Sequence, residues 1–327
     1  MIVTVTLNAA LDVTYQVPAL RLGHTHRPTA ADVRAGGKGV NVARVLHALG
    51  HETMVTGLVG GDTGAAIRAD VLLAGLREAL FDMAGPSRRT VTIVSDGTAT
   101  AVNEPGPRVS ISDWADFVGG YHALAARASV VVLSGSLPPG LPDDAYAQLI
   151  RATPTPVILD TSGPPLLAGI AARPAVVKPN AHELTEATGL DDPGAAARAL
   201  LDRGAHAVVA SLGPDGLIAV SHEGSWRVRV PEELHGNPTG AGDACVAALA
   251  AGQALEWPDR LAEAVAVSAA AVPCPLAGDI DPDTYRRLRP AITVEELVPP
   301  VGSSAHDSVA YSHTDLPTGG TDAHADR

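Results

Sequence analysis

A glycine-rich segment over residues 237–244, NPTGAGDA, carries the clearest chemical signal in the sequence. It leads directly into an alanine-rich stretch with the composition of a helix. Gly240 and Gly242, with Ala241 between them, allow backbone amides to converge where the positive end of the helix dipole favours an anion. Asp243 follows. Its carboxylate would repel a bound phosphate, so its presence there is explained best if it accepts a proton from an attacking hydroxyl. The segment indicates phosphoryl transfer, although by itself it fits an ordinary glycine turn with an acidic first helical turn equally well.

The same segment fits a dinucleotide-binding loop poorly. In the G-x-G-x-x-G pattern a third glycine would stand where the chain has Cys245. Pro238 interrupts the preceding strand, and the carboxylate of Asp243 would face the pyrophosphate. A nicotinamide-dependent redox enzyme is therefore disfavoured.

A second anion site is indicated by a glycine-rich helix entry that holds one lysine, Gly36-Gly37-Lys38-Gly39. No serine or threonine follows the lysine, so this is not the phosphate loop of P-loop NTPases. Lys38 and Lys178 are the only lysines among 23 basic residues, which suggests that each ammonium group serves a tight anion site. Asn41 lies one turn along, on a similar helix face. A glycine-rich helix entry with a solvated lysine remains the alternative.

Polar turns shaped by glycine or proline follow three more predicted strands, and they contain Ser136 (GSLPPG), Asn180 and Glu183 (KPNAHE), and Ser211 (SLGPDG). Because the carboxyl ends of parallel strands meet at one edge of a sheet, these turns indicate a ligand cleft there. Asn180 and Glu183 offer oxygen ligands for Mg²⁺, directly or through water. Asp12, after the first predicted strand, could bind sugar hydroxyls at the same edge. Each of these residues, taken alone, also fits a plain turn or helix cap.

The elements that must position these residues follow a regular alternation. Short β-branched runs alternate with alanine- and leucine-rich amphipathic stretches, which predicts an α/β fold with a mostly parallel sheet. Predicted strands are residues 2–7, 53–58, 129–133, 157–159, 175–177 and 207–210, with a hairpin from 217–220 and 226–230. Predicted helices are residues 40–49, 65–76, 113–126, 143–151, 164–172, 194–203, 241–254 and 258–272.

Three segments depart from this alternation. Residues 13–33 and 90–102 alternate apolar and polar positions, as exposed antiparallel strands do, so we expect them to pair into one small sheet. Residues 301–327 are rich in Ser, Thr, Gly, Asp and His, with little to bury, so we expect this tail to be disordered.

Composition excludes several classes of function. The 327 residues, 46% of them hydrophobic, suffice for one large core. A net charge of -13 without a basic run speaks against nucleic acid as a partner. No apolar stretch approaches the roughly 20 residues of a membrane span, and the start lacks signal-peptide features, so we expect a cytoplasmic protein that binds no membrane. Cys245 and Cys274 are too few for a disulfide framework or a thiolate metal site.

Eight motifs occur in a characteristic order: LNAALD, GGKGVNVARVL, NEPGP, LSGSLPPGLP, LDTSG, VKPNAHEL, ASLGPDG and NPTGAGDA. Over about residues 2–288 the chain resembles the PfkB (ribokinase-like) carbohydrate kinases, in the branch of 1-phosphofructokinases, minor 6-phosphofructokinases and tagatose-6-phosphate kinases. The resemblance implies a three-layer α/β/α sandwich with a mostly parallel central sheet and a small inserted β-sheet lid. It further implies a kinase domain over residues 1–300, with the lid built from about 13–35 and 88–104.

The resemblance also implies roles for single residues. Asp243 would deprotonate the acceptor hydroxyl, while the backbone of Gly240, Ala241 and Gly242 would stabilise the transferred phosphoryl group. The residues implied at the sugar are Asp12, Gly37, Lys38 and Asn41. Arg88, or its neighbour Arg89, would bind the phosphate that the sugar already carries, together with Ser136. The residues implied at the nucleotide are Lys178, Asn180, Ser211, Gly213, Gly216 and Thr239, with Asn180 and Glu183 at Mg²⁺.

The resulting expectation is a kinase that uses ATP and Mg²⁺. Its acceptor would be a ketohexose monophosphate, namely fructose 1-phosphate, fructose 6-phosphate or tagatose 6-phosphate, and its product the bisphosphate. A kinase of an unphosphorylated sugar or nucleoside and a non-catalytic sugar-phosphate-binding protein remain alternatives. Because exposed strand edges need a partner, we expect a homodimer through the lid.

Overall fold

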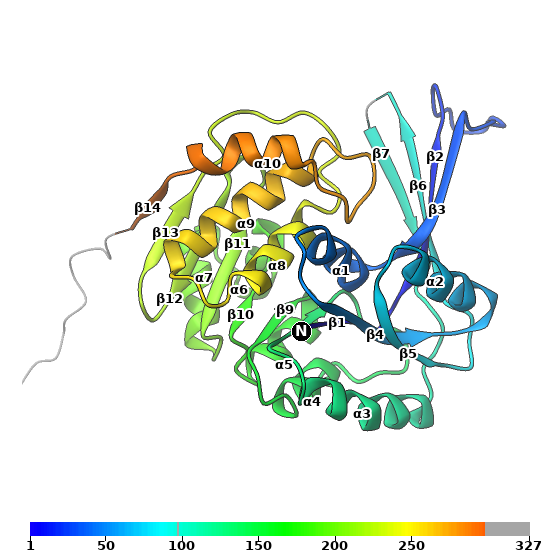
Figure 1. The fold of residues 1–327 in the computed structure, drawn as a ribbon, viewed down its shortest axis with the longest axis horizontal. Helices are drawn as coiled ribbons and strands as arrows, with labels where there is room; N and C mark the ends of the chain where they lie inside the picture. Colours follow the sequence, from blue (N-terminus) through cyan, green and yellow to red (C-terminus); the bar gives the residue numbers. More distant parts are fainter. Residues whose placement is uncertain (97, 298–327) are drawn as a thin grey trace, which may run out of the picture. The chain divides into compact units, whose positions relative to one another are not determined.

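Ten strands form one large sheet in the order β14-β13-β12-β11-β10-β9-β8-β1-β4-β5 (Figure 1). The seven strands from β11 to β5 run parallel, and β12, β13 and β14 extend the sheet antiparallel. The bounds are β1 (Ile2–Thr6), β4 (Thr53–Val59), β5 (Arg77–Asp82), β8 (Val130–Ser134), β9 (Val157–Asp160), β10 (Val176–Val177), β11 (Ala207–Ser211), β12 (Leu217–Ser221), β13 (Ser225–Val228) and β14 (Val294–Glu296).

This computed structural model describes residues 1–96 and 98–297. The predicted tail, residues 301–327, lies outside the described residues. The central strands are buried along their whole length, as β1, β8 and β9 show, because helices cover both faces of the sheet.

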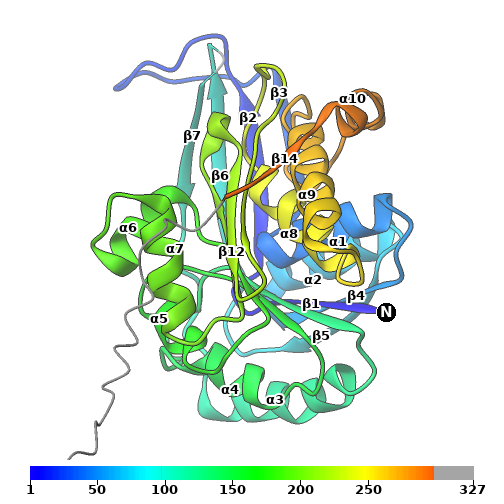
Figure 2. The same ribbon diagram turned by 90° about the vertical axis from the view of Figure 1, so that its left-hand side faces the viewer.

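One helical layer comprises α1 (Lys38–Ala48), α2 (Gly61–Leu73), α8 (Ala241–Ala251), α9 (Trp257–Ala271) and α10 (Pro282–Leu288). The opposite layer comprises α3 (Ile111–Ala125), α4 (Ala145–Arg151), α5 (Gly163–Ile170), α6 (Ala181–Thr188) and α7 (Pro193–Asp202). Figure 2 shows the large sheet between the two layers. Two short 3-10 helices, η1 (Gly213–Asp215) and η2 (Arg289–Ala291), complete the described elements.

A second sheet of four strands has the order β3-β2-β6-β7, with β2 (Ala10–Gln16), β3 (Ala30–Gly36), β6 (Arg88–Ser95) and β7 (Thr98–Asn103). The two hairpin pairs are antiparallel, whereas β2 and β6 run parallel. Only residues 7–9 separate β1 from β2, and β3 ends two residues before α1 begins. This small sheet therefore starts at the carboxyl end of β1 and rises away from the large sheet (Figure 1).

The structure confirms the predicted α/β class and the pairing of the two inserted segments into one small sheet. Two strands and two α-helices were missed, namely β5, β14, α6 and α10, as were the two 3-10 helices. Strand β5, REALFD, lies at the edge of the sheet and is only partly buried, so it lacks the continuous apolar run of an inner strand. Helices α6 (AHELTEAT) and α10 (PDTYRRL) bury only one and two residues, so they lack the apolar stripe that the equally short α4 and α5 carry.

Candidate functional site

A row of polar residues crosses the large sheet at the carboxyl ends of its central strands. Ser134 pairs in register with Asp160, and Lys178 follows β10 with its amide donating to the carbonyl of Leu159 at 3.0 Å. Side chains at equivalent positions of neighbouring strands share a face. Ile158, two residues before Asp160 and on the same face of β9, packs with residues of α1 and α8, so the row faces that helical layer.

Asp160 is the centre of this row, and its side chain is fully buried. Its Oδ1 lies 3.2 Å from the Nζ of Lys38 and 3.5 Å from the Nζ of Lys178, and its Oδ2 accepts a hydrogen bond from Ser134 at 3.1 Å. Burial opposes ionisation, but the two ammonium groups outweigh it and lower the pKa of Asp160. Both lysines of the chain are thus held by one carboxylate, a role that the sequence motif LDTSG did not reveal.

The pKa of Lys38 is raised in the same network. Burial opposes its positive charge, yet Asp160, Asp243 and Glu183 together stabilise the ammonium form. Lys38 is the first residue of α1, and its side chain keeps 40% of its surface exposed. A charged group that is anchored at one side and open at the other can reach a ligand anion.

Asp243 stands in the first turn of α8, where the chain leaves Gly240 in a left-handed conformation with φ 91°. A Cβ at Gly240 would approach the Cα of Ala277 to 2.8 Å, so the turn requires glycine. The buried carboxylate accepts a hydrogen bond from Nδ2 of Asn41 at 2.8 Å. Burial and the neighbouring Asp160 raise the pKa of Asp243 to about 6, against the opposing effect of Lys38.

The start of α8 has the properties of an anion site. The first amides of a helix have no acceptor within the helix. In the described structure the carbonyl of Pro238 accepts from Ala241 at 3.1 Å, and the next amides belong to Gly242 and Asp243. A Cβ at Gly242 would lie 3.6 Å from the Nζ of Lys178, which places the buried ammonium beside these amides. The two signals that the sequence placed 60 residues apart, the glycine motif and Lys178, are therefore brought together.

Asp12 lies at the base of the small sheet, in register with Arg34 on β3 and Thr90 on β6. A Cβ at Gly36, two residues before α1, would come within 1.8 Å of Oδ2 of Asp12, and the next residue, Gly37, packs on Ala9 between β1 and β2. Burial raises the pKa of Asp12 to about 6, although Arg88 and Thr90 favour its ionised form. A carboxylate held close to the start of α1 can accept hydrogen bonds from a polyol.

Arg88 and Arg89 point to opposite faces of β6, because side chains alternate along a strand. Arg88 and Thr90 share the face of Asp12, and Nε of Arg88 donates to the carbonyl of Asn8 at 3.0 Å. Nδ2 of Asn8 donates to Oγ of Ser136 at 3.2 Å. Asn8 thus joins the two residues predicted at the sugar's own phosphate, a role that its place in LNAALD did not reveal.

The residues predicted at the nucleotide lie around the carboxyl ends of β10 and β11. Asn180 forms a parallel bridge with Ser211, and η1 begins directly afterwards at Gly213. Gly216 follows η1 as its C-cap, and Thr239 donates its amide to Oδ1 of Asn237 at 3.0 Å just before α8.

Asn180 and Glu183 form the capping box of α6. Oδ1 of Asn180 accepts from the amide of Glu183 at 2.8 Å, and Oε2 of Glu183 accepts from the amide of Asn180 at 2.9 Å. Within the described residues no cluster of three or more His, Cys, Asp or Glu side chains is arranged to hold a metal ion. Carboxylate and amide oxygens nevertheless suit Mg²⁺, which binds few protein ligands when phosphates supply the others. The donor set fits a magnesium ion carried by a nucleotide.

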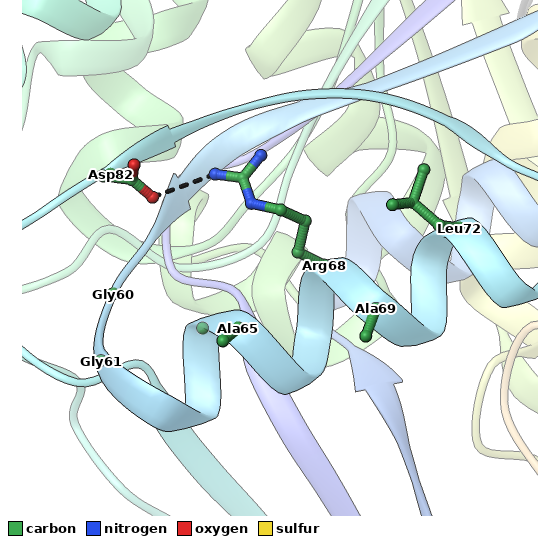
Figure 3. Close-up of a pocket in the computed structure, with 8 residues that line it drawn as sticks. Gly60, Gly61, Ala65, Arg68, Ala69, Leu72 and Asp82 are labelled. Carbon is green, nitrogen blue, oxygen red and sulfur yellow. Dashed lines mark hydrogen bonds and ion pairs between the residues drawn. The ribbon is translucent and has the colours of Figure 1, made fainter.

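A separate pocket lies along α2 and is lined by none of the predicted site residues (Figure 3). Arg68 crosses it toward Asp82, with 3.0 Å between Nη2 and Oδ1, and also pairs with Glu78. Its guanidinium is therefore already neutralised, and the pocket is not part of the candidate site.

Comparison with known proteins adds family information. Residues 5–284 match the family model described as "pfkB family carbohydrate kinase". Every helix in the described part of the chain is too short or too polar to cross a membrane.

Solved structures of similar proteins include three phosphofructokinases. A putative phosphofructokinase from Staphylococcus aureus is 28% identical with a TM-score of 0.77, over 91% of this chain and 99% of that one. The tetrameric inhibited form of phosphofructokinase-2 from Escherichia coli is 27% identical with a TM-score of 0.82, over 89% and 98%. A possible 1-phosphofructokinase from Thermotoga maritima is 26% identical with a TM-score of 0.78, over 91% and 100%.

Proposed function

Because the chain belongs to the pfkB family of carbohydrate kinases, we propose that it transfers the γ-phosphoryl group of ATP to a hydroxyl of a ketohexose monophosphate. Fructose 1-phosphate, fructose 6-phosphate and tagatose 6-phosphate are the candidate acceptors, and the products are the bisphosphate and ADP. The structural relatives named as phosphofructokinases support this substrate class.

One observation carries the proposal: a buried carboxylate, Asp243, lies in the same helical turn as the amides that favour an anion. A negative group at an anion site would weaken phosphate binding unless it took part in the reaction. The hydrogen bond from Asn41 orients the carboxylate, and its pKa of about 6 keeps it mostly ionised at neutral pH while leaving it basic enough to accept a proton.

The reaction is balanced by four changes in bonding. The acceptor O–H bond breaks as its proton passes to Asp243, and the freed oxygen forms a bond to the γ-phosphorus. The bond from that phosphorus to the leaving oxygen of ADP breaks at the same time. The amides of Gly242 and Asp243 and the ammonium of Lys178 stabilise the negative charge that develops on the transferred group. Magnesium, when bound with the nucleotide, neutralises charge on its phosphates, and Asn180 and Glu183 would hold it directly or through water.

The sugar occupies the other part of the site. Asp12, Gly37, Lys38 and Asn41 bind its hydroxyls, and Arg88 with Ser136 binds the phosphate that it already carries. The contact from Asn8 to both Arg88 and Ser136 supports this assignment, since it aligns one cation and one hydroxyl for a single anion. The nucleotide lies along Ser211, Gly213, Gly216 and Thr239.

The small sheet acts as a lid over the sugar and as the contact between two subunits of a homodimer. Val33, Val13, Val91 and Val102 form a row across one face of this sheet. Val33 and Val102 are 56% and 59% exposed, and a second subunit packed on this face would bury both side chains. The proposed kinase domain is residues 1–300, and we place the enzyme in the cytoplasm.

A substrate panel tests this proposal. We expect ADP release with at least one of the three ketohexose monophosphates and far less with fructose. Asp243→Asn should bind both substrates in calorimetry yet lose nearly all turnover. Equal rates with fructose and its phosphates would refute the substrate class, and retained turnover in Asp243→Asn would refute the assignment of the base.

A further inference from the structure

A bidentate ion pair joins the small sheet to the loop that follows α9. Arg34 on β3 donates from Nη1 to Oδ2 of Asp279 at 3.0 Å and from Nη2 to Oδ1 at 3.2 Å. The arginine side chain is only 14% exposed. A paired arginine fork fixes both the distance and the orientation of the two segments it connects.

The arginine end of this pair lies at the sugar part of the site. Arg34 is the cross-strand neighbour of Asp12, and its charge is one of those that favour the ionised carboxylate. A shift of β3 that moved Arg34 would therefore move the surroundings of Asp12 as well.

The aspartate end lies behind the phosphoryl-transfer part of the site. Ala277 packs on Gly240 at the start of α8, where an added Cβ would meet its Cα at 2.8 Å. A Cβ at Gly278 would lie 3.2 Å from the Cα of Asn41, the residue that donates to Asp243. Residues 277–279 therefore contact the anion site, the helix that orients the base, and the small sheet.

Arg44, the other arginine near this loop, is paired elsewhere. Arg44 lies on α1, near enough to Arg34 for the two positive charges to repel each other. Arg44 pairs with Asp70, and Asp70 also accepts a hydrogen bond from the amide of Ala35 at 2.7 Å. The second arginine thus ties α1 to α2 and to the base of β3. Arg44 also packs against the loop, since a Cβ at Gly278 would lie 3.0 Å from its Cδ, but among the described residues only Arg34 forms a salt bridge to Asp279.

We propose that Arg34 is a positioning residue whose ion pair with Asp279 couples the sugar site to the phosphoryl-transfer site. Each substrate then binds more tightly when the other is present, and the two effects are equal because coupling of binding free energies is reciprocal. This inference rests on the proposed function for the identity of the two ligands.

The test measures coupling by calorimetry. The sugar phosphate that the wild type turns over is titrated alone and with a non-hydrolysable ATP analogue, into wild type, Arg34→Gln, Asp279→Asn and the double variant. We expect the analogue to tighten sugar-phosphate binding about tenfold in the wild type and to leave the dissociation constant unchanged in all three variants. Arg77→Gln, which loses an exposed pair with Glu52, should keep the wild-type ratio.

Two results would overturn the proposal. One is an unchanged ratio in either single variant. The other is weaker sugar-phosphate binding without nucleotide in Arg34→Gln but not in Asp279→Asn, which would show that Arg34 contacts the sugar phosphate directly.

A second readout needs no substrate. Amide hydrogen exchange of the ligand-free protein should be faster over β3 in Arg34→Gln and Asp279→Asn than in wild type, and unchanged in Arg77→Gln. Equal rates in wild type and both variants would overturn the ion pair as a link. A wild type that phosphorylates none of the sugar phosphates would contradict the proposed function. The hydrogen-exchange result would still test whether the Arg34–Asp279 pair holds β3 to the loop after α9.

Discussion

At the scale of single residues, the proton affinity of Asp243 gives the site a pH dependence. Burial and Asp160 raise its pKa to about 6, and only the ionised form can accept the proton of the sugar hydroxyl. We therefore expect kcat to rise with pH through about 6 and to level off above 7. The measurement is the initial rate at saturating substrates from pH 5 to 8.

Saturating substrate separates the titration of Asp243 from that of Asp12. Asp12 also has a pKa of about 6, and it acts on sugar binding, so its titration enters kcat/KM more than kcat. Near-ultraviolet circular dichroism at pH 5 controls for acid unfolding. A kcat that stays constant between pH 5 and 7 would contradict the assignment of Asp243.

The buried carboxylate of Asp160 predicts a loss of stability. Asp160→Asn removes the negative charge that compensates Lys178, whose side chain is only 4% exposed. Breaking a buried pair from one side costs about 3 kcal/mol or more. We expect a loss of this size in the free energy of unfolding by urea.

Ser134→Ala is the matched control, because it removes one hydrogen bond to the same carboxylate and leaves both charges. Its expected cost is about 1–2 kcal/mol. If Asp160→Asn cost no more than Ser134→Ala, Asp160 would not be the group that compensates Lys178.

The two adjacent arginines of β6 should differ in function. Arg88 lies on the face of Asp12 and contacts Asn8, whereas the side chain of Arg89 points to the other face. Arg88→Gln should raise KM for the sugar phosphate at least about tenfold, since a charge-assisted contact to phosphate is lost. Arg89→Gln is the control and should leave KM near the wild-type value in steady-state kinetics. The reverse pattern would assign the phosphate to Arg89.

At the scale of elements, the close approach of β3 to β2 depends on Gly36. A Cβ there would come within 1.8 Å of Oδ2 of Asp12, so Gly36→Ala must displace this carboxylate. We expect a rise in KM for the sugar phosphate of about tenfold or more, because Asp12 then no longer meets the sugar hydroxyls.

Gly119→Ala is the control for Gly36→Ala. Gly119 lies within α3, and nothing approaches its Cβ position within 4 Å. Its substitution should leave KM unchanged and stabilise the fold by about 0.5–1 kcal/mol, as helix propensity predicts. Equal KM values in the two variants would show that Asp12 tolerates the displacement.

The elements also show what the sequence could predict. The glycine motif before α8 and the glycine-lysine motif before α1 were recognisable because each is local, with its glycines and charged residue within one turn. Asp160 has the same burial as its apolar neighbours, and its partner Lys38 is 122 residues away. Arg34 likewise meets Asp279 across 245 residues. Such contacts are set by the topology of the sheets, and no local pattern reveals them.

Strand register distinguishes two adjacent residues that the sequence could not separate with certainty. From the sequence, Arg88 was the predicted phosphate ligand, with its neighbour Arg89 as the alternative. The pairing of β2 with β6 fixes which of them shares the face of Asp12, because a shift by one residue would reverse both faces.

At the scale of the whole molecule, the small sheet exposes the two ends of an apolar row, Val33 and Val102, and most of its two edge strands. Strands β3 and β7 are its edges, and β7 is exposed along its whole length. Exposed edges and apolar rows favour pairing with another chain. A twofold axis at this face would cover Val33 and Val102 of both subunits with a single contact.

This arrangement predicts that the chain sediments as a dimer and that Val33→Asp with Val102→Asp halves its mass. In a dimer, the two introduced carboxylates of one subunit would be buried against those of the other. Burying these charges costs far more free energy than exposing them on a monomer. Leu73→Asp is the control: Leu73 is 87% exposed on α2, outside the small sheet, so its substitution should leave the dimer intact. Because the small sheet also holds Asp12 and Arg34, the monomeric variant should bind the sugar phosphate more weakly than wild type in calorimetry. A wild type that sediments as a monomer at micromolar concentration, or a double variant that remains dimeric, would place the subunit contact elsewhere.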